Sequence, residues 1–149
     1  MHVFSVNKEA VPLARTIGAA ALVFASVVGA FAENSAQRAV LDRYLTEAKT
    51  DPGYFGPSAE RGRVFFFAAH AGGKADTPAC TACHSRNLAE PGQTKAGKPI
   101  EPMAASLAPS RYSDPATVEK WFRRNCHDVL GRACSAAEKA DVLTFLLSL

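Results

Sequence analysis

The residues of this 149-residue chain with the clearest chemistry are two cysteines and a histidine, in the pattern Cys80-x-x-Cys83-His84. Two thiols three positions apart, with an imidazole directly after them, are typical of covalent c-type haem attachment. Each thiol can add to one haem vinyl group to form a thioether, and the imidazole can bind the iron from one side. The pattern therefore predicts one covalently bound haem c, attached to Cys80 and Cys83, with His84 as the proximal iron ligand.

A zinc site is the other chemistry that four cysteines can serve, because Cys-x-x-Cys is also half of a tetrahedral zinc site. The remaining cysteines, Cys126 and Cys134, are farther apart than the ligands of a zinc half-site. A histidine directly after Cys83 is needed for haem and is unnecessary for zinc. These observations favour haem.

The ligand on the other side of the iron decides whether a haem protein only carries electrons or also binds small molecules. Met103 offers a thioether beside Pro102, in the segment after the haem motif, as in electron-carrying cytochromes c. Asn125 offers an amide oxygen, although asparagine here is also typical of a helix C-terminus. His70 and His127 are expected to be surface residues. From the residues alone, Met103 and Asn125 both stay candidates.

The N-terminus has the features of a secretory signal peptide. A positively charged start precedes an uncharged apolar run over 16–29, which is followed by a small-x-small cleavage site ending at Ala32. We expect residues 1–32 to be cleaved as a signal peptide and the mature chain to be periplasmic in a bacterium. An uncleaved membrane anchor is the alternative.

The charge balance does not favour nucleic acid or an anionic membrane as a partner. The chain has 17 basic and 14 acidic residues. Removal of the signal peptide takes away two basic residues and one acidic residue, which leaves a formal charge of +2. Two haem propionates would bring the total close to zero. We therefore expect contact with a membrane only through a partner protein.

Helical periodicity and capping signals predict an all-α fold. A first helix over 33–50 has a narrow apolar stripe, and we expect it to form an N-terminal helical extension over 33–53. A cytochrome c domain would follow over 54–149. Its first helix begins after Ser58 and is predicted to run to Gly72-Gly73, with Gly62 admitting a closely packed partner helix.

Two more helices are predicted after the haem motif. Asp114-Pro115 is a strong start signal for a helix through Cys126. A capping box over 135–138 begins the last helix, which runs to the end of the chain with one apolar face. The segment 85–109 contains many proline and glycine residues, and we expect it to be irregular and to cover a haem face. No internal repeat or strand-like alternation is present.

The third helix and the segment after it carry a resemblance to a known family. The sequence reads Lys-Trp-Phe-Arg-Arg-Asn-Cys over 120–126 and Gly-Arg-Ala-Cys over 131–134, with Glu-Lys at 138–139. This pattern resembles the sphaeroides haem protein family of high-spin class I cytochromes c, and the resemblance covers residues 55–149. It implies that Asn125 is the distal haem ligand and that Cys126 and Cys134 form a disulfide.

The ligand set has a chemical consequence for function. A neutral amide oxygen is a weak, hard donor, so we expect Asn125 to stay on ferric iron and to leave the softer ferrous ion. Reduction would then open a site for a diatomic ligand such as oxygen, nitric oxide or carbon monoxide. The resemblance also implies a dihaem cytochrome c and a membrane cytochrome b as redox partners. Met103 departs from the family pattern and keeps mixed coordination open.

Several side chains are candidates to hold the haem propionates, because a guanidinium fits a carboxylate in a two-point fork and an indole N–H can donate once. These are Arg111, Trp121, Arg123 and Lys98. The alternative is ordinary solvated surface charge with a core tryptophan.

Two other functions stay open beside a ligand-binding cytochrome. One is a simple electron shuttle with Met103 on the iron, and the other is a gas-binding module without turnover. The sequence has no paired carboxylates, nucleophile triad or phosphate loop, so any catalysis would belong to the haem.

Overall fold

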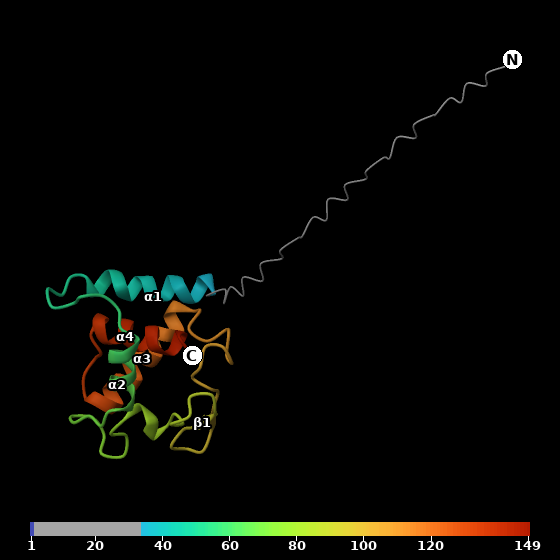
Figure 1. Ribbon diagram of the computed structural model, residues 1–149. Coiled ribbons are helices and arrows are strands. Elements are labelled where there is room, and N and C mark those ends of the chain that lie inside the picture. Colours follow the sequence, from blue (N-terminus) through green and yellow to red (C-terminus); the bar gives the residue numbers. More distant parts are fainter. Residues whose placement is uncertain (2–33) are drawn as a thin grey trace.

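Four α-helices confirm the predicted all-α fold class. The computed structural model describes Met1 and residues 34–149, and the predicted signal peptide lies outside the described residues. The helices are α1 (Ser35–Ala48), α2 (Ala59–Phe67), α3 (Pro115–Leu130) and α4 (Ala136–Leu147), with a 3-10 turn, η1, at Cys80–Ala82 (Figure 1). Within the described part of the chain, no helix is long and apolar enough to span a bilayer.

The segment 85–109 is more ordered than predicted. It contains a two-stranded antiparallel sheet, in which β1 (Gly92–Gln93) pairs with β2 (Pro99–Ile100). The turn between the strands is closed by Thr94, whose hydroxyl accepts a hydrogen bond from the backbone N of Lys98 at 3.0 Å. Strands of two residues leave no alternating pattern in the sequence, which is why this hairpin was not predicted.

Helices α2 and α4 form the closest helix pair in the described structure, and a glycine makes their approach possible. A Cβ atom added at Gly62 would overlap the backbone carbonyl of Asp141 on α4. The side chain of Asp141 is buried and binds both Ser58 N, at 2.7 Å, and Arg61 Nε, at 2.7 Å. The predicted role of Gly62 is confirmed, and Asp141 fixes the start of α2 at the crossing point.

Helix α2 ends at Phe67, five residues before the predicted end at Gly72. The chain turns away because the His70 backbone bonds outside the helix, while the His70 ring approaches a carbonyl of the last turn. The backbone N of His70 donates to the carbonyl of Pro78 at 2.7 Å, and His70 Nε2 lies 2.8 Å from the carbonyl oxygen of Phe65. This end of α2 depends on the contact with Pro78, which the sequence does not reveal.

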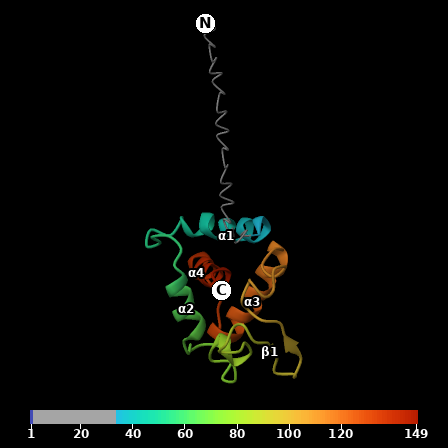
Figure 2. The same cartoon turned by 45° about the vertical axis from the view of Figure 1, so that its right-hand side comes forward.

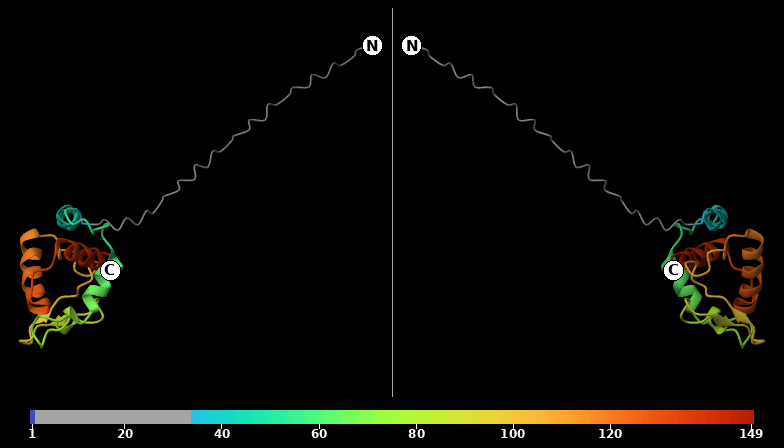
Figure 3. Two further views of the ribbon diagram at one scale, coloured as in Figure 1. Left: turned by 90° about the vertical axis from the view of Figure 1, so that its left-hand side faces the viewer. Right: turned by 90° about the vertical axis from the view of Figure 1, so that its right-hand side faces the viewer.

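Helix α1 packs tightly, although the apolar stripe in its sequence is narrow. Val40, Leu41 and Tyr44 are each at most 4% exposed and share a hydrophobic cluster with Ala140 and Leu143 of α4. Figures 1 and 3 show α1 across the end of the molecule opposite to the segment that contains η1 and β1. The helix therefore contributes to the core, and a division of the chain after residue 53 stays a prediction.

Helix α3 begins as predicted but ends four residues later. The side chain of Asp114 accepts a hydrogen bond from Thr117 N at 2.7 Å, and Pro115 occupies the first turn. The helix continues past Cys126 to Leu130, where Gly131 adopts a left-handed conformation with φ of 69° and ends it. A glycine in this conformation is a common helix terminator. Asn125 consequently lies inside the helix and does not cap it.

The predicted capping box opens α4. Ser135 Oγ accepts from Glu138 N at 3.2 Å, and a Glu138 carboxylate oxygen accepts from Ser135 N at 2.8 Å. Arg132 donates to both oxygens of the same carboxylate, at 2.8 and 2.7 Å. Hydrogen bonding to Arg132 lowers the pKa of Glu138 below its ordinary value, against an opposing contribution from burial.

A lowered carboxyl pKa predicts a specific pH dependence of stability. Glu138 stabilises the fold fully above the ordinary glutamate pKa of about 4.3, and this contribution is lost as the pH falls through the lower folded-state pKa. When the pH is lowered from 7 to 3.5, we expect the melting temperature of Glu138→Gln to fall by less than that of the wild type. Glu47→Gln is the control, because Glu47 pairs with Arg43 on an exposed face of α1. Equal acid sensitivity of wild type and Glu138→Gln would contradict the prediction.

Candidate haem site

The haem-attachment motif lies in a tight turn. Cys80 begins η1, and its carbonyl accepts hydrogen bonds from Cys83 N at 3.3 Å and from His84 N at 3.1 Å. Both Cys80 and Cys83 are free thiols, and both are partly buried. The local hydrogen bonds of the turn thus bring the two thiols and the imidazole into one small segment.

His84 has the environment of a metal-binding imidazole. Its ring centroid lies 5.9 Å from that of Phe66 on α2, and its buried Nδ1 has no hydrogen-bond partner among the described residues. Burial and, to a lesser extent, the positive charge of Arg111 lower the pKa of His84 to about 4. The ring is therefore neutral at pH 7, as a metal ligand must be. Packing against Phe66, rather than a hydrogen bond, holds the ring in position.

These residues fit a covalently bound haem and do not fit zinc. The two thiols and the neutral imidazole are the donor set that haem c needs. The other two cysteines are joined as Cys126–Cys134, with their Cα atoms 5.6 Å apart, and cannot act as thiolate ligands. No group of three or more histidine, cysteine or acidic side chains within 34–149 is placed to hold a metal ion.

A glycine lets the β1 strand pass directly beside the haem motif. The backbone N of Gln93 donates to the carbonyl of Cys83 at 2.8 Å, and a Cβ atom at Gly92 would overlap that carbonyl. The segment after the motif therefore folds back onto it. Sequence reasoning placed Gly92 in an irregular loop, because a close approach between backbones leaves no local pattern.

Asn125 and Trp121 lie on α3, across the molecule from α2. The two residues are separated by one helical turn and share a face of the helix. Both side chains are exposed, and the Trp121 ring is flanked by Arg124 Cζ at 5.3 Å and Lys120 Nζ at 5.8 Å from its centroid. Figure 2 shows α2 and α3 on either side of α4, with the motif segment at the end away from α1.

The end of α3 is fastened to the segment that precedes the haem motif. Lys74 N donates to the carbonyl of Asp128 at 2.7 Å, and Lys74 Nζ lies 2.7 Å from the Asp128 carboxylate. Thr77 Oγ1 also donates to the Asp128 carbonyl, at 3.0 Å. A Cβ atom at Gly73 would overlap the same carbonyl. Together with the adjacent Cys126–Cys134 disulfide, these contacts join α3 to the chain that leads to Cys80.

Met103 is placed in the core. It is 9% exposed and packs with Phe66 and Leu88 in a hydrophobic cluster, and Phe66 is the residue whose ring faces His84. The Met103 backbone N donates to the carbonyl of Leu88 at 2.9 Å, and its carbonyl accepts from Tyr112 Oη at 2.7 Å. Met103 is therefore a buried member of the cluster that Phe66 links to His84.

The predicted propionate-binding residues are not gathered in one place. Arg111 lies near His84, and its Nε is buried without a partner among the described residues, while Nη2 donates to the carbonyl of Glu101 at 3.1 Å. Lys98 is exposed next to the hairpin turn, and Trp121 and Arg123 are exposed on α3. Of the four, Arg111 has an unpaired buried donor beside the predicted ligand, so it is the strongest candidate to bind a carboxylate.

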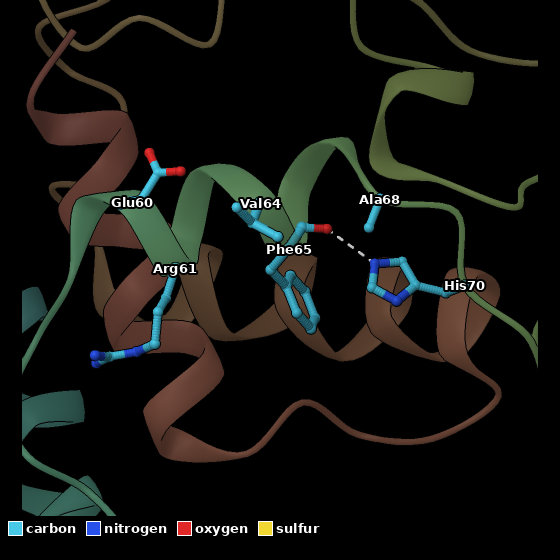
Figure 4. A pocket seen from close by; sticks show the side chains of 6 residues that line it. All are labelled: Glu60, Arg61, Val64, Phe65, Ala68 and His70. Carbon is cyan, nitrogen blue, oxygen red and sulfur yellow. Dashed lines mark hydrogen bonds between the residues drawn. The ribbon is translucent and has the colours of Figure 1, made fainter.

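His70 is not associated with the motif. It lies at the end of a shallow pocket along the outside of α2, where its ring points to the carbonyl of Phe65 (Figure 4). His127 is exposed on α3. Neither histidine is placed where the predicted ligands are, in agreement with their interpretation as surface residues.

The fold and the site together define a small class I-type cytochrome c. The family model described as a domain of unknown function, DUF1924, matches residues 52–146. The cytochrome c-type protein SHP of Cereibacter sphaeroides is 52% identical over 88 residues, which are 59% of this chain and 68% of that protein. The chain therefore belongs to the sphaeroides haem protein family, and it is a c-type cytochrome with one covalently bound haem c.

Solved structures support the same assignment. Oxidised SHP, an oxygen-binding cytochrome c, superposes with a TM-score of 0.70 at 42% identity and covers 76% of this chain and 96% of its own. Oxidised cytochrome c'' from Methylophilus methylotrophus superposes with a TM-score of 0.63 at 31% identity, covering 76% of this chain and 94% of its own. Cytochrome c'' is also 35% identical in sequence over 99 residues.

Proposed function

We propose that the protein is a periplasmic monohaem cytochrome in which Cys80 and Cys83 attach the haem and His84 and Asn125 bind its iron. On reduction the Asn125 amide leaves the iron, and the distal site becomes available to a diatomic ligand such as oxygen or nitric oxide. The predicted signal peptide supports export to the periplasm.

The position of Asn125 within α3 is the observation that carries this proposal. A helix C-terminus was the other interpretation of Asn125, and Gly131 fills that role instead. The Asn125 side chain makes no hydrogen bond within the described structure and is exposed on the same face as Trp121. Its amide is thus free to bind an external group, whereas Met103 is packed in the core beside Phe66.

The relatives support a site that exchanges ligands. SHP is described as an oxygen-binding cytochrome c, and the solution structure of cytochrome c'' concerns haem-ligand detachment. Both properties need a coordination position on the iron that is free or can become free. A side-chain amide can free such a position, because its neutral oxygen donates less strongly than a thioether to ferrous iron.

The bound haem would supply the redox change and the coordination position. The protein would supply the rest of the chemistry. His84 is neutral and held by packing against Phe66, so it can bind without first losing a proton. The Asn125 amide, once released, keeps an N–H donor for a hydrogen bond to a nearby polar ligand. Arg111 would pair with a propionate through the nitrogen that has no partner within 34–149.

Absorption spectra of the purified holoprotein in both oxidation states, with and without carbon monoxide, test the proposal. We expect a ferric spectrum without the long-wavelength band of an iron–thioether bond. Carbon monoxide should shift the Soret band of the ferrous protein and leave the ferric spectrum unchanged. A thioether band, together with a ferrous protein that does not respond to carbon monoxide, would establish the electron shuttle with Met103 on the iron.

The redox partners that we propose are a dihaem cytochrome c, which would deliver electrons, and a membrane cytochrome b upstream of it. This part of the proposal follows from the family resemblance. Steady consumption of oxygen or nitric oxide by the continuously reduced protein would distinguish a redox role from a gas-binding module without turnover.

A further inference from the structure

We propose that Tyr44 on α1 is a positioning residue for the distal ligand, because it fixes the rotation of the helix that carries Asn125. This inference rests on the proposed role of Asn125. Helix α1 precedes the segment matched by the family model, which begins at residue 52. Its contacts with α3 nevertheless connect it to the candidate site.

Helix α3 is held by side chains along its length, including Phe122, which packs against all three hydrophobic clusters. The closest helix pairs in the described structure are α2 with α4 and α1 with α4. The C-terminal part of α3 is fastened by the Cys126–Cys134 disulfide and by Asp128. In its first half, Glu119 accepts a hydrogen bond from Tyr44 Oη at 2.9 Å. Its carboxylate also binds Lys139 Nζ of α4, at 2.9 and 2.8 Å.

The hydrogen bond between Tyr44 and Glu119 is shielded from water, so it can hold α1 and α3 together. Tyr44 is 1% exposed, and the side chain of Lys139 is 11% exposed. The Tyr44 ring meets Phe122 of α3 edge to face, with ring centroids 5.7 Å apart. Burial raises the pKa of Glu119, but hydrogen bonds from Lys139 and Tyr44 outweigh it and keep the pKa below its ordinary value. The phenol therefore donates to an ionised carboxylate, which makes a stronger hydrogen bond than a neutral acceptor.

The helical period relates this contact to the ligand. Glu119 and Asn125 are six residues apart, so they lie about 120° apart around the helix axis, with the inward-facing Phe122 between them. A rotation of α3 by about 20° would move the tip of a side chain by about 2 Å. Ligand geometry tolerates errors of only about 0.5 Å. Glu119 and Asn125 thus lie at opposite edges of the buried face of α3. By holding Glu119 at one edge, Tyr44 also sets the direction of Asn125 at the other.

The experiment compares two tyrosine variants of the holoprotein. Tyr44→Phe removes the hydroxyl group that bonds Glu119 and keeps the ring against Phe122. Tyr54→Phe is the matched control, because Tyr54 packs against the same hydrophobic cluster and its buried Oη has no partner among the described residues. Azide binding to the ferric protein is the readout, since azide competes with the Asn125 amide for the iron. We expect Tyr44→Phe to increase azide affinity about threefold or more, and Tyr54→Phe to leave it unchanged.

Variants at Asn125 separate this inference from the proposed function. In an Asn125→Ala background, Tyr44→Phe should have no further effect on azide affinity, because its effect acts through Asn125. An unchanged azide affinity in Tyr44→Phe, beside a raised affinity in Asn125→Ala, would overturn the positioning role and leave the ligand assignment intact. An unchanged affinity in Asn125→Ala would overturn both.

Discussion

Replacement of Asn125 by alanine is expected to change the ferric absorption spectrum and to raise the affinity of the ferric protein for azide about tenfold. The size follows from competition: if the amide occupies the iron in about nine-tenths of ferric molecules, only the remaining tenth can bind azide in the wild type. Alanine is a good helix former, so α3 should persist. Optical titration of the ferric holoprotein with azide measures the change.

Two matched variants test whether this effect belongs to Asn125. His127→Ala changes an exposed residue two positions further along α3 and should leave the spectrum as in the wild type. Met103→Leu conserves volume in the core and should do the same, because Met103 is a buried member of the cluster around Phe66 and the proposed distal ligand is Asn125. Identical spectra for Asn125→Ala and the wild type would show that the Asn125 amide is not an iron ligand. A changed spectrum in Met103→Leu would show that the Met103 sulfur binds the iron instead.

The largest expected effect on stability is that of Gly62→Ala. A glycine-to-alanine change within a helix ordinarily stabilises a protein by about 1 kcal/mol. At Gly62 the added methyl group would overlap the backbone carbonyl of Asp141, which cannot rotate away as a side chain could. We expect the free energy of unfolding to fall by about 3 kcal/mol, the upper range for overpacked sites. That is a substantial part of the total of about 5–15 kcal/mol for a small domain.

Gly53→Ala is the control for this prediction. Its added Cβ would lie 3.4 Å from Asp51 Oδ1, which is an ordinary van der Waals distance. Denaturant unfolding of the holoprotein, followed by far-ultraviolet circular dichroism, compares the two variants with the wild type. Equal midpoints for Gly62→Ala and Gly53→Ala would show that α2 and α4 can separate at little cost, contrary to the close crossing.

The helix starts could be predicted from the sequence, because each depends on a few adjacent residues. Ser58, Asp114 and Ser135 cap α2, α3 and α4 through hydrogen bonds to residues no more than three positions away. The ends of helices were predicted less well. Helix α2 stops where His70 bonds the distant Pro78, and α3 continues to Gly131. No local signal marked either position unambiguously.

The candidate site shows the same division between local and distant information. The attachment motif is local, and its residues could be named directly. The distal ligand that we propose, Asn125, could be named only from the family resemblance, because asparagine in a helix has no chemical pattern of its own. The docking of α1 depends on residues far along the chain, namely Ala140 and Leu143 of α4 and Glu119 of α3, and a narrow apolar stripe does not predict it.

The short spacing of Cys126 and Cys134 also bears on how the protein matures after export. The export that we propose would bring the chain into an oxidising compartment with four thiols, of which two must stay reduced until the haem is attached. Pairing Cys126 with Cys134 closes a loop of 8 residues, whereas pairing Cys126 with Cys83 would close one of 43. The shorter loop is favoured by about 1.5 kcal/mol of closure entropy, or roughly tenfold. The local bridge thus keeps Cys126 and Cys134 from cross-linking to the attachment cysteines.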